Sequence, residues 1–253
     1  MMTSTMKNNS LIAILSKVAV FAFWMLIWYL LALWVNNPLF LPTPTQAFGS
    51  LFELLQKPVF YKVIACSFLR VLAGILLGIA LGLSLAIICN KSSIIEKLLS
   101  PFFSVIKATP VATFIVLLWI LLNGSALAII IAVLMVMPII WQNTLDGFGA
   151  IPKELIEVTD IFELPYRKKF RILILPVLKK YIFPAIITSI GLGWKAEIAA
   201  EIIAYTKDSI GMYINDAKSF MQTSNVYAWT IVIICMSVLL ENGAKFLIRR
   251  LNK

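Results

Sequence analysis

The chain has 253 residues, of which 61% are hydrophobic and only 13% are charged, and its mean hydropathy is +0.94. A soluble domain is nearer half apolar and a quarter charged, so this composition excludes an ordinary soluble fold and favours one helical bundle in lipid. A net charge of +10 would indicate nucleic-acid binding in a soluble protein, but membrane proteins also retain Lys and Arg in cytoplasmic loops, which fits better here.

The chain lacks the residues that most enzymes and metal sites use. It has no histidine, which is the commonest metal ligand and the commonest acid or base at neutral pH. Cys66, Cys89 and Cys235 lie in or beside apolar runs, and their spacing matches neither a zinc site nor a redox pair. We therefore expect no catalytic residue, no metal, no cofactor and no enzymatic activity.

Six stretches are long and apolar enough to cross a bilayer, which takes about 20 helical residues. They are residues 11–35, 63–89, 98–106 with 111–122, 126–141, 181–204 and 226–248. Lys107, Thr109 and Pro110 break the third. A signal peptide is the alternative for the first, but its apolar run is too long and no small-residue cleavage pattern follows. The predicted fold is all-α, a polytopic membrane bundle of six transmembrane helices.

The basic residues predict the orientation of this bundle. With both termini in the cytoplasm, fifteen of the 22 Lys and Arg residues fall in inner loops and tails, four in outer loops and three in spans. This asymmetry favours that orientation. We expect a single transmembrane domain over 1–253. Its core lies at about 63–250 with a cytoplasmic loop at 146–180, and a first span and external segment occupy 1–62, where 45–55 form an amphipathic turn or two.

Several residues inside the spans have two interpretations. Gly74, Gly78 and Gly82 recur every fourth residue and predict close helix packing rather than a transport role. Arg70 lies near a span end, where its side chain is expected to reach water. Charges deeper in a span either pair internally or face a water-filled path, and both readings stay open. The candidates for a path or gate are Lys107, Pro110, Trp194, Lys195, Glu197 and Glu201.

The segment 146–180 is too long for a simple hairpin between spans. Acidic residues come first and basic residues at 167–171 come last, which suits the dipole of a helix that begins near Pro152 and ends or kinks at Pro165. A membrane-surface helix is one interpretation. The acidic start disfavours it, because anionic lipid heads would repel those carboxylates. A protein partner with a groove is favoured instead.

This loop resembles the "EAA" loop of importer permeases of the ATP-binding-cassette class. That pattern is Glu-Ala-Ala, three residues, Gly, nine residues, then Ile-x-Leu-Pro. Here Glu157-Val158-Thr159, Glu163 and Leu173-Ile174-Leu175-Pro176 keep the spacing, with both alanines and the glycine replaced. We expect Pro165 to supply the bend that the glycine provides in the family.

Further motifs resemble one group of these permeases, the nitrate/sulfonate/taurine/bicarbonate group, over about residues 38–250. They are Leu41-Pro42-Thr43-Pro44, Ser67-Phe68-Leu69-Arg70 with Gly74, Pro138 with Asn143, Thr144 and Gly147, Gly193-Trp194-Lys195-Ala196 with Glu201, and Ser209-Ile210-Gly211.

The resemblance implies a multi-pass protein of the bacterial cytoplasmic membrane, paired as a homodimer around a path for a small solute of the nitrate/sulfonate/taurine-like class. It implies separate cytoplasmic ATPase subunits and an extracytoplasmic substrate-binding protein as partners, besides membrane lipid, and no nucleic acid. The residues that would couple the path to the ATPase are Glu154, Glu157, Val158, Thr159, Glu163, Leu164 and Pro165.

Two other classes of protein remain as alternatives. An ion-gradient-driven secondary transporter would use Lys195, Glu197 and Glu201 as a relay, but such folds usually contain inverted repeats, and none is visible in this sequence. An intramembrane enzyme would need a nucleophile and a base, which the sequence does not offer. The sequence does not identify the solute.

Overall fold

The structure is a computed structural model that describes residues 3–122 and 124–251, with side chains over 15–122 and 124–250. All regular elements within these residues are helical. The chain divides into two compact units. The first holds the chain up to Phe60 together with Asp216–Val232, and the second holds Tyr61–Asn215 together with the chain from Ile233.

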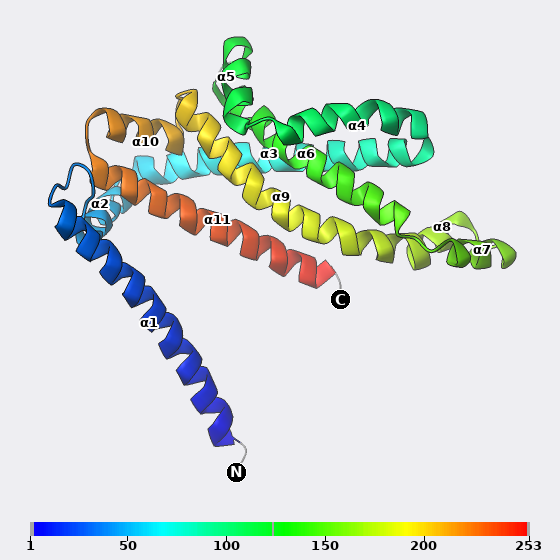
Figure 1. The fold of residues 1–253 in the computed structure, drawn as a ribbon, viewed down its shortest axis with the longest axis horizontal. Coiled ribbons are helices and arrows are strands. Elements are labelled where there is room, and N and C mark those ends of the chain that lie inside the picture. The colour runs from blue at the N-terminus through cyan, green and yellow to red at the C-terminus, as the bar shows by residue number, and fades with distance from the viewer. Residues whose placement is uncertain (1–2, 123, 252–253) are drawn as a thin grey trace. The chain divides into compact units, whose positions relative to one another are not determined.

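Five helical stretches are long and apolar enough to cross a membrane, and a bent pair of helices makes a sixth if counted as one span. The long helices are α1 (Thr3–Val35), α3 (Pro58–Lys91), α6 (Gly124–Gly149), α9 (Leu175–Ile203) and α11 (Thr223–Leu251). The bent pair is α4 (Ser93–Ala108) and α5 (Val111–Leu121). The prediction of an all-α polytopic bundle is confirmed (Figure 1).

In the first unit, α1 is followed by α2 (Pro44–Leu55), which a capping box begins. Thr43 Oγ1 accepts a hydrogen bond from the Gln46 amide, and Gln46 Oε1 accepts one from the Thr43 amide. Trp28 on α1 donates from Nε1 to the Pro42 carbonyl at 3.0 Å, which fixes the turn before α2. The amphipathic turn predicted at 45–55 is thus a 12-residue helix.

In the second unit, α3 packs against α6 along the predicted glycine stripe. A methyl group at Gly78 would lie 2.8 Å from Cβ of Val136, and one at Gly82 would lie 2.8 Å from Cβ of Ile140. Real Cβ atoms do not approach so closely, so the helices meet at this distance only because these positions lack a side chain. The interpretation of the stripe as a packing surface is confirmed.

The predicted break in the third span is also present. The helices α4 and α5 are bent by 104° relative to each other at Thr109 and Pro110, and α5 stands away from α4 in Figure 1. Phe103 on α4 stacks on Trp141 of α6, with 4.3 Å between the ring centroids. On the other side of the bend, Ile115 of α5 lies in an apolar cluster with α6 and α9.

The long loop contains two short helices, α7 (Lys153–Ile161) and α8 (Tyr166–Lys169), which lie at the same end of the second unit (Figure 1). As predicted, a helix begins after Pro152 and ends before Pro165. The short helix α8 after Pro165 was not predicted. A π-helical turn over Phe170–Ile174 continues into α9. After α9, the chain turns through residues 204–209 into α10 (Ile210–Ser219).

Candidate functional site

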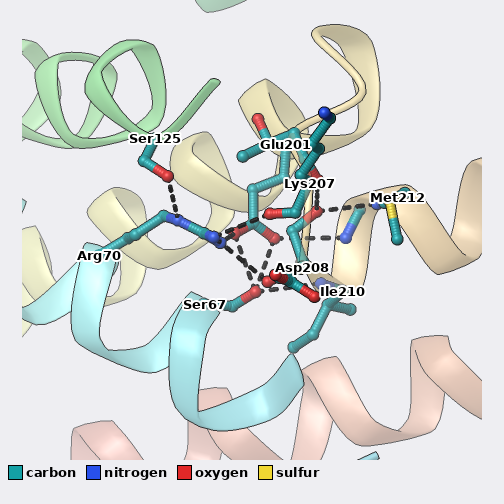
Figure 2. A network of polar contacts seen from close by, with 11 residues as sticks. Ser67, Arg70, Ser125, Glu201, Lys207, Asp208, Ile210 and Met212 are labelled. Atoms are coloured by element: carbon teal, nitrogen blue, oxygen red, sulfur yellow. Dashed lines mark hydrogen bonds and ion pairs between the residues drawn. The ribbon is translucent and has the colours of Figure 1, made fainter. Parts of the chain in front are cut away.

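A buried ion pair joins α3 to the end of α9 (Figure 2). Arg70 Nη1 donates to Glu201 Oε1 at 2.7 Å; the Glu201 side chain is 0% exposed and that of Arg70 is 11% exposed. Such a pair is held together because losing one partner would leave an uncompensated charge in an apolar interior. The carboxylate partner of Arg70 thus lies on another helix, a contact that the sequence did not predict.

Ser67 and the Gly211 amide also bind the Glu201 carboxylate, and the Ile210 amide binds Ser67. Ser67 Oγ lies 2.8 Å from both carboxylate oxygens and accepts a hydrogen bond from the Ile210 amide at 3.0 Å. The Gly211 amide donates to Glu201 Oε2 at 3.2 Å. A side chain at Gly211 would overlap the Glu201 backbone, so this close approach requires glycine.

The rest of the Arg70 guanidinium holds the turn that follows α9. Its Nη2 donates to the carbonyls of Lys207 and Asp208 at 2.9 and 3.2 Å, and its Nε donates to Ser125 Oγ at the start of α6. Tyr205 and Asp208 in this turn have positive φ angles of 49° and 50°. The network therefore fixes a turn that its own residues would not strongly favour.

A second polar feature is a cavity of about 360 Å³ beside the bend between α4 and α5. Lys107 from α4 and Lys195 from α9 both line it, with Thr109 at the bend itself. The remaining lining is mostly apolar and, among the described residues, contains no acidic side chain. Two cations beside a shared cavity with low-dielectric walls create a positive potential that attracts an anion.

Of the other candidates for the path, Pro110 lies at the bend beside this cavity, whereas Trp194, Glu197 and Glu201 do not line it. Glu197 and Glu201 are fully buried on the inner face of α9, whereas Lys195 is on its exposed face. Trp194 is buried and donates from Nε1 to the Ile233 carbonyl of α11 at 3.2 Å. Pro110 is the residue before α5. The structure thus brings Lys107 and Lys195 together and separates Lys195 from both carboxylates.

The turn after α7 has the hydrogen bonds of a Schellman motif. The Glu163 amide donates to the Asp160 carbonyl and the Leu164 amide donates to the Thr159 carbonyl, both at 3.0 Å. Glu163 has a φ of +46°, in the left-handed region that favours glycine. The turn that the glycine of the "EAA" pattern provides is therefore made by Glu163 itself. Pro165 follows this turn and is the extended residue before α8.

The helix α7 presents an exposed apolar patch, defined here by Leu155, Val158, Ile161 and Phe162. Ile161 is 78% exposed and Phe162 is 72% exposed. Among the predicted coupling residues, Val158 belongs to this patch, Glu154, Glu157, Glu163 and Pro165 are exposed, Leu164 is half-buried, and Thr159 is buried. Lys169 of α8 binds Asp160 of α7 at 2.7 Å and ties the two short helices together.

Residues 74–253 match the family described as the binding-protein-dependent transport system inner membrane component. This match covers well over half of the chain. The chain belongs to this family of importer permeases. It is thus a multi-pass cell-membrane protein of the ATP-binding-cassette class and is not itself an enzyme. The ion-gradient-driven alternative is set aside.

Curated relatives place the permease in the group indicated by its motifs. It is 27% identical over 215 residues to the putative aliphatic sulfonates transport permease protein SsuC of Bacillus subtilis, covering 84% of this chain and 77% of that protein. It is 30% identical over 195 residues to the bicarbonate transport system permease protein CmpB of Synechocystis, covering 76% and 69%. The taurine transport system permease protein TauC of Escherichia coli is 25% identical over 89% of this chain and 84% of that one.

A solved structure supports the fold. A chain of the MetNI methionine ABC transporter, in an inward-facing conformation, superposes with a TM-score of 0.59 and 14% sequence identity. The match covers 78% of this permease and 96% of that chain.

Sequence reasoning missed the partner of Glu201. The signal was present, because Ser67, Arg70 and Glu201 all fall in motifs shared with the permease group. The spacing between those motifs is more than 130 residues, so no helical periodicity could connect them. Only the packing of α3 against α9 shows that these motifs form one network.

Proposed function

We propose that this permease forms the membrane path for a small anion and couples it to ATP hydrolysis by a separate cytoplasmic ATPase. A substrate-binding protein delivers the anion from outside, and a second copy of the chain completes the path. The single observation that carries the choice of an anion is the cavity shared by Lys107 and Lys195. Its relatives named for sulfonates, bicarbonate and taurine support the same choice.

The position of Lys195 supports a role in the path rather than in the core. A lysine near the middle of a span costs about 3 kcal/mol or more unless it is paired or hydrated. Glu197 and Glu201 do not offset this cost, because they lie on the buried face of α9. A hydrated path between two copies of the chain provides the water, and a passing anion provides transient pairing.

The apolar patch on α7 supports the coupling role. Exposed apolar side chains on a segment outside the spans mark a protein contact. The Schellman turn and the Lys169–Asp160 ion pair make α7 and α8 a connected unit that leads through the π-helical turn into α9. A movement of the ATPase that displaces α7 is therefore transmitted to the helix that carries Lys195.

The path is tested by ATP-dependent uptake into proteoliposomes that hold the complete transporter. Labelled nitrate and bicarbonate serve as anionic probes, labelled taurine serves as a zwitterionic sulfonate, and labelled thiamine serves as a cationic probe. We expect uptake of at least one anion, and we expect Lys195→Met to lower it about tenfold or more per assembled complex. Lys91→Met, at an exposed position away from the cavity, should leave it unchanged. Uptake of the cation alone, or unchanged anion uptake by Lys195→Met, would contradict the proposal.

A further inference from the structure

A groove of about 730 Å³ lies along the first half of α9, beside the end of α11. Arg171, Lys179 and Lys180 line one part of it, with Leu175 and Pro176 between the arginine and the lysines. Phe183, Pro184 and Ile187 line the next part along α9, with Ile248 of α11. Among the described residues, no acidic side chain lines this groove. The groove shares no lining residue with the Lys107–Lys195 cavity or with the patch on α7.

The order of side chains along the groove matches the order of groups in a phospholipid. All three cations lie in the part next to α8, where Leu175 and Pro176 separate Arg171 from the lysines, and only apolar residues line the groove one to two turns beyond Lys180. Lys179 Nζ lies 5.9 Å from the centre of the Phe183 ring, so the boundary between the two parts falls at this pair. A phosphate at the basic end would place an acyl chain against Phe183, Pro184 and Ile187.

We infer that this groove binds one anionic phospholipid of the inner leaflet. Charge complementarity selects the headgroup, because three cations without an acidic neighbour attract a net negative lipid and gain little from a zwitterionic one. The excess of Lys and Arg in the neighbouring loop predicts that this end faces the cytoplasm. The apolar half of the groove distinguishes a lipid from a free oxyanion, which would not need it.

The lipid would also stabilise the junction between α8 and α9. Arg171 lies in the π-helical turn that joins α8 to α9, while Lys179 and Lys180 lie on α9 itself. One headgroup phosphate bridging these cations would hold the turn against the helix. This site stands independently of the proposed solute.

The test uses the full-length chain, purified in detergent and titrated with palmitoyl-oleoyl phosphatidylglycerol, with bound lipid counted by native mass spectrometry. Each lost cation should weaken binding about fivefold, so the triple variant Arg171→Gln, Lys179→Gln, Lys180→Gln should retain less than about a tenth of the lipid. The control Lys91→Gln, Lys97→Gln removes exposed cations outside the groove and should bind as the wild type does. The charge-preserving variant Arg171→Lys, Lys179→Arg, Lys180→Arg should also bind, which separates loss of charge from misfolding.

Three results would overturn the inference. One is binding of palmitoyl-oleoyl phosphatidylcholine that is as tight as the binding of phosphatidylglycerol. Another is a loss of lipid binding in the Lys91→Gln, Lys97→Gln control that is as large as the loss in the triple variant. The third is displacement of the lipid by inorganic phosphate at matched concentration, or by assembly with the ATPase, because the groove would then hold a free oxyanion or a protein.

Ile187→Trp gives a further check. It fills the apolar part without changing charge and should also lower phosphatidylglycerol binding.

Discussion

At the scale of single residues, the helix α9 separates two kinds of charge onto two faces. Glu201 lies inside the protein with Arg70, Ser67 and the Gly211 amide around it, whereas Lys195 lies on the exposed face beside a cavity. The first arrangement joins α3, α9 and the start of α10 through one carboxylate. In the second arrangement, Lys195 shares a cavity with Lys107, and we propose that these two cations attract the solute.

The Arg70–Glu201 pair should behave as a coupled structural unit. Removing either partner of a buried pair costs about 3–5 kcal/mol, so Arg70→Met and Glu201→Gln should each lower the thermal stability of the detergent-solubilised chain. The double variant should lose less than the sum of the two, with a coupling energy of about 0.5–3 kcal/mol. Strict additivity in this double-mutant cycle would show that the two side chains do not depend on each other.

Glu163 makes a turn that glycine would make with less strain. A left-handed conformation costs a non-glycine residue about 1–2 kcal/mol, so Glu163→Gly should raise the stability of the chain by about 1 kcal/mol. Glu157→Gly, within α7, should lower it by about 1 kcal/mol and serves as the matched control. Thermal unfolding of the two variants should show these opposite changes in stability. A loss of stability in Glu163→Gly would refute the role of the positive φ.

At the scale of helices, the sequence predicted each span, the broken third span and the helix after Pro152 from hydropathy and proline positions. These features depend on local sequence, and the structure confirms them. The contacts of Arg70 and the shared cavity of Lys107 and Lys195 could not be predicted in the same way. They depend on which helices are neighbours, and hydropathy does not carry that information.

The glycine stripe gives a test at this scale. Gly78→Ala should lower stability by about 1–3 kcal/mol, because its new Cβ would lie 2.8 Å from Cβ of Val136 and force α3 away from α6. Gly243→Ala in α11 is the matched control, since nothing lies within 4 Å of a Cβ there. It should be neutral or raise stability by up to about 1 kcal/mol. Equal effects at the two positions would argue against close packing at Gly78.

At the scale of the whole molecule, the basic loops predict the orientation in the membrane, and direct labelling tests it. In a background without Cys66, Cys89 and Cys235, a cysteine at Gln56 should react with an impermeant thiol reagent in intact cells. Cysteines at Ser92 and Lys153 should react only after the membrane is permeabilised. Labelling of Lys153→Cys from outside would reverse the proposed orientation and move the α7 patch away from any cytoplasmic ATPase.

The central claim is that this permease couples to an ATPase through α7. The most direct test purifies the tagged chain from its own membrane and measures the ATPase activity that copurifies with it. The wild type should carry ATPase activity, and Ile161→Asp should lower it by about tenfold or more, because a charge enters the centre of an apolar contact. Phe40→Asp, at an equally exposed apolar side chain on the segment predicted to lie outside, should keep the activity. Wild-type protein that carries no ATPase activity, or an Ile161→Asp variant that retains all of it, would contradict the account.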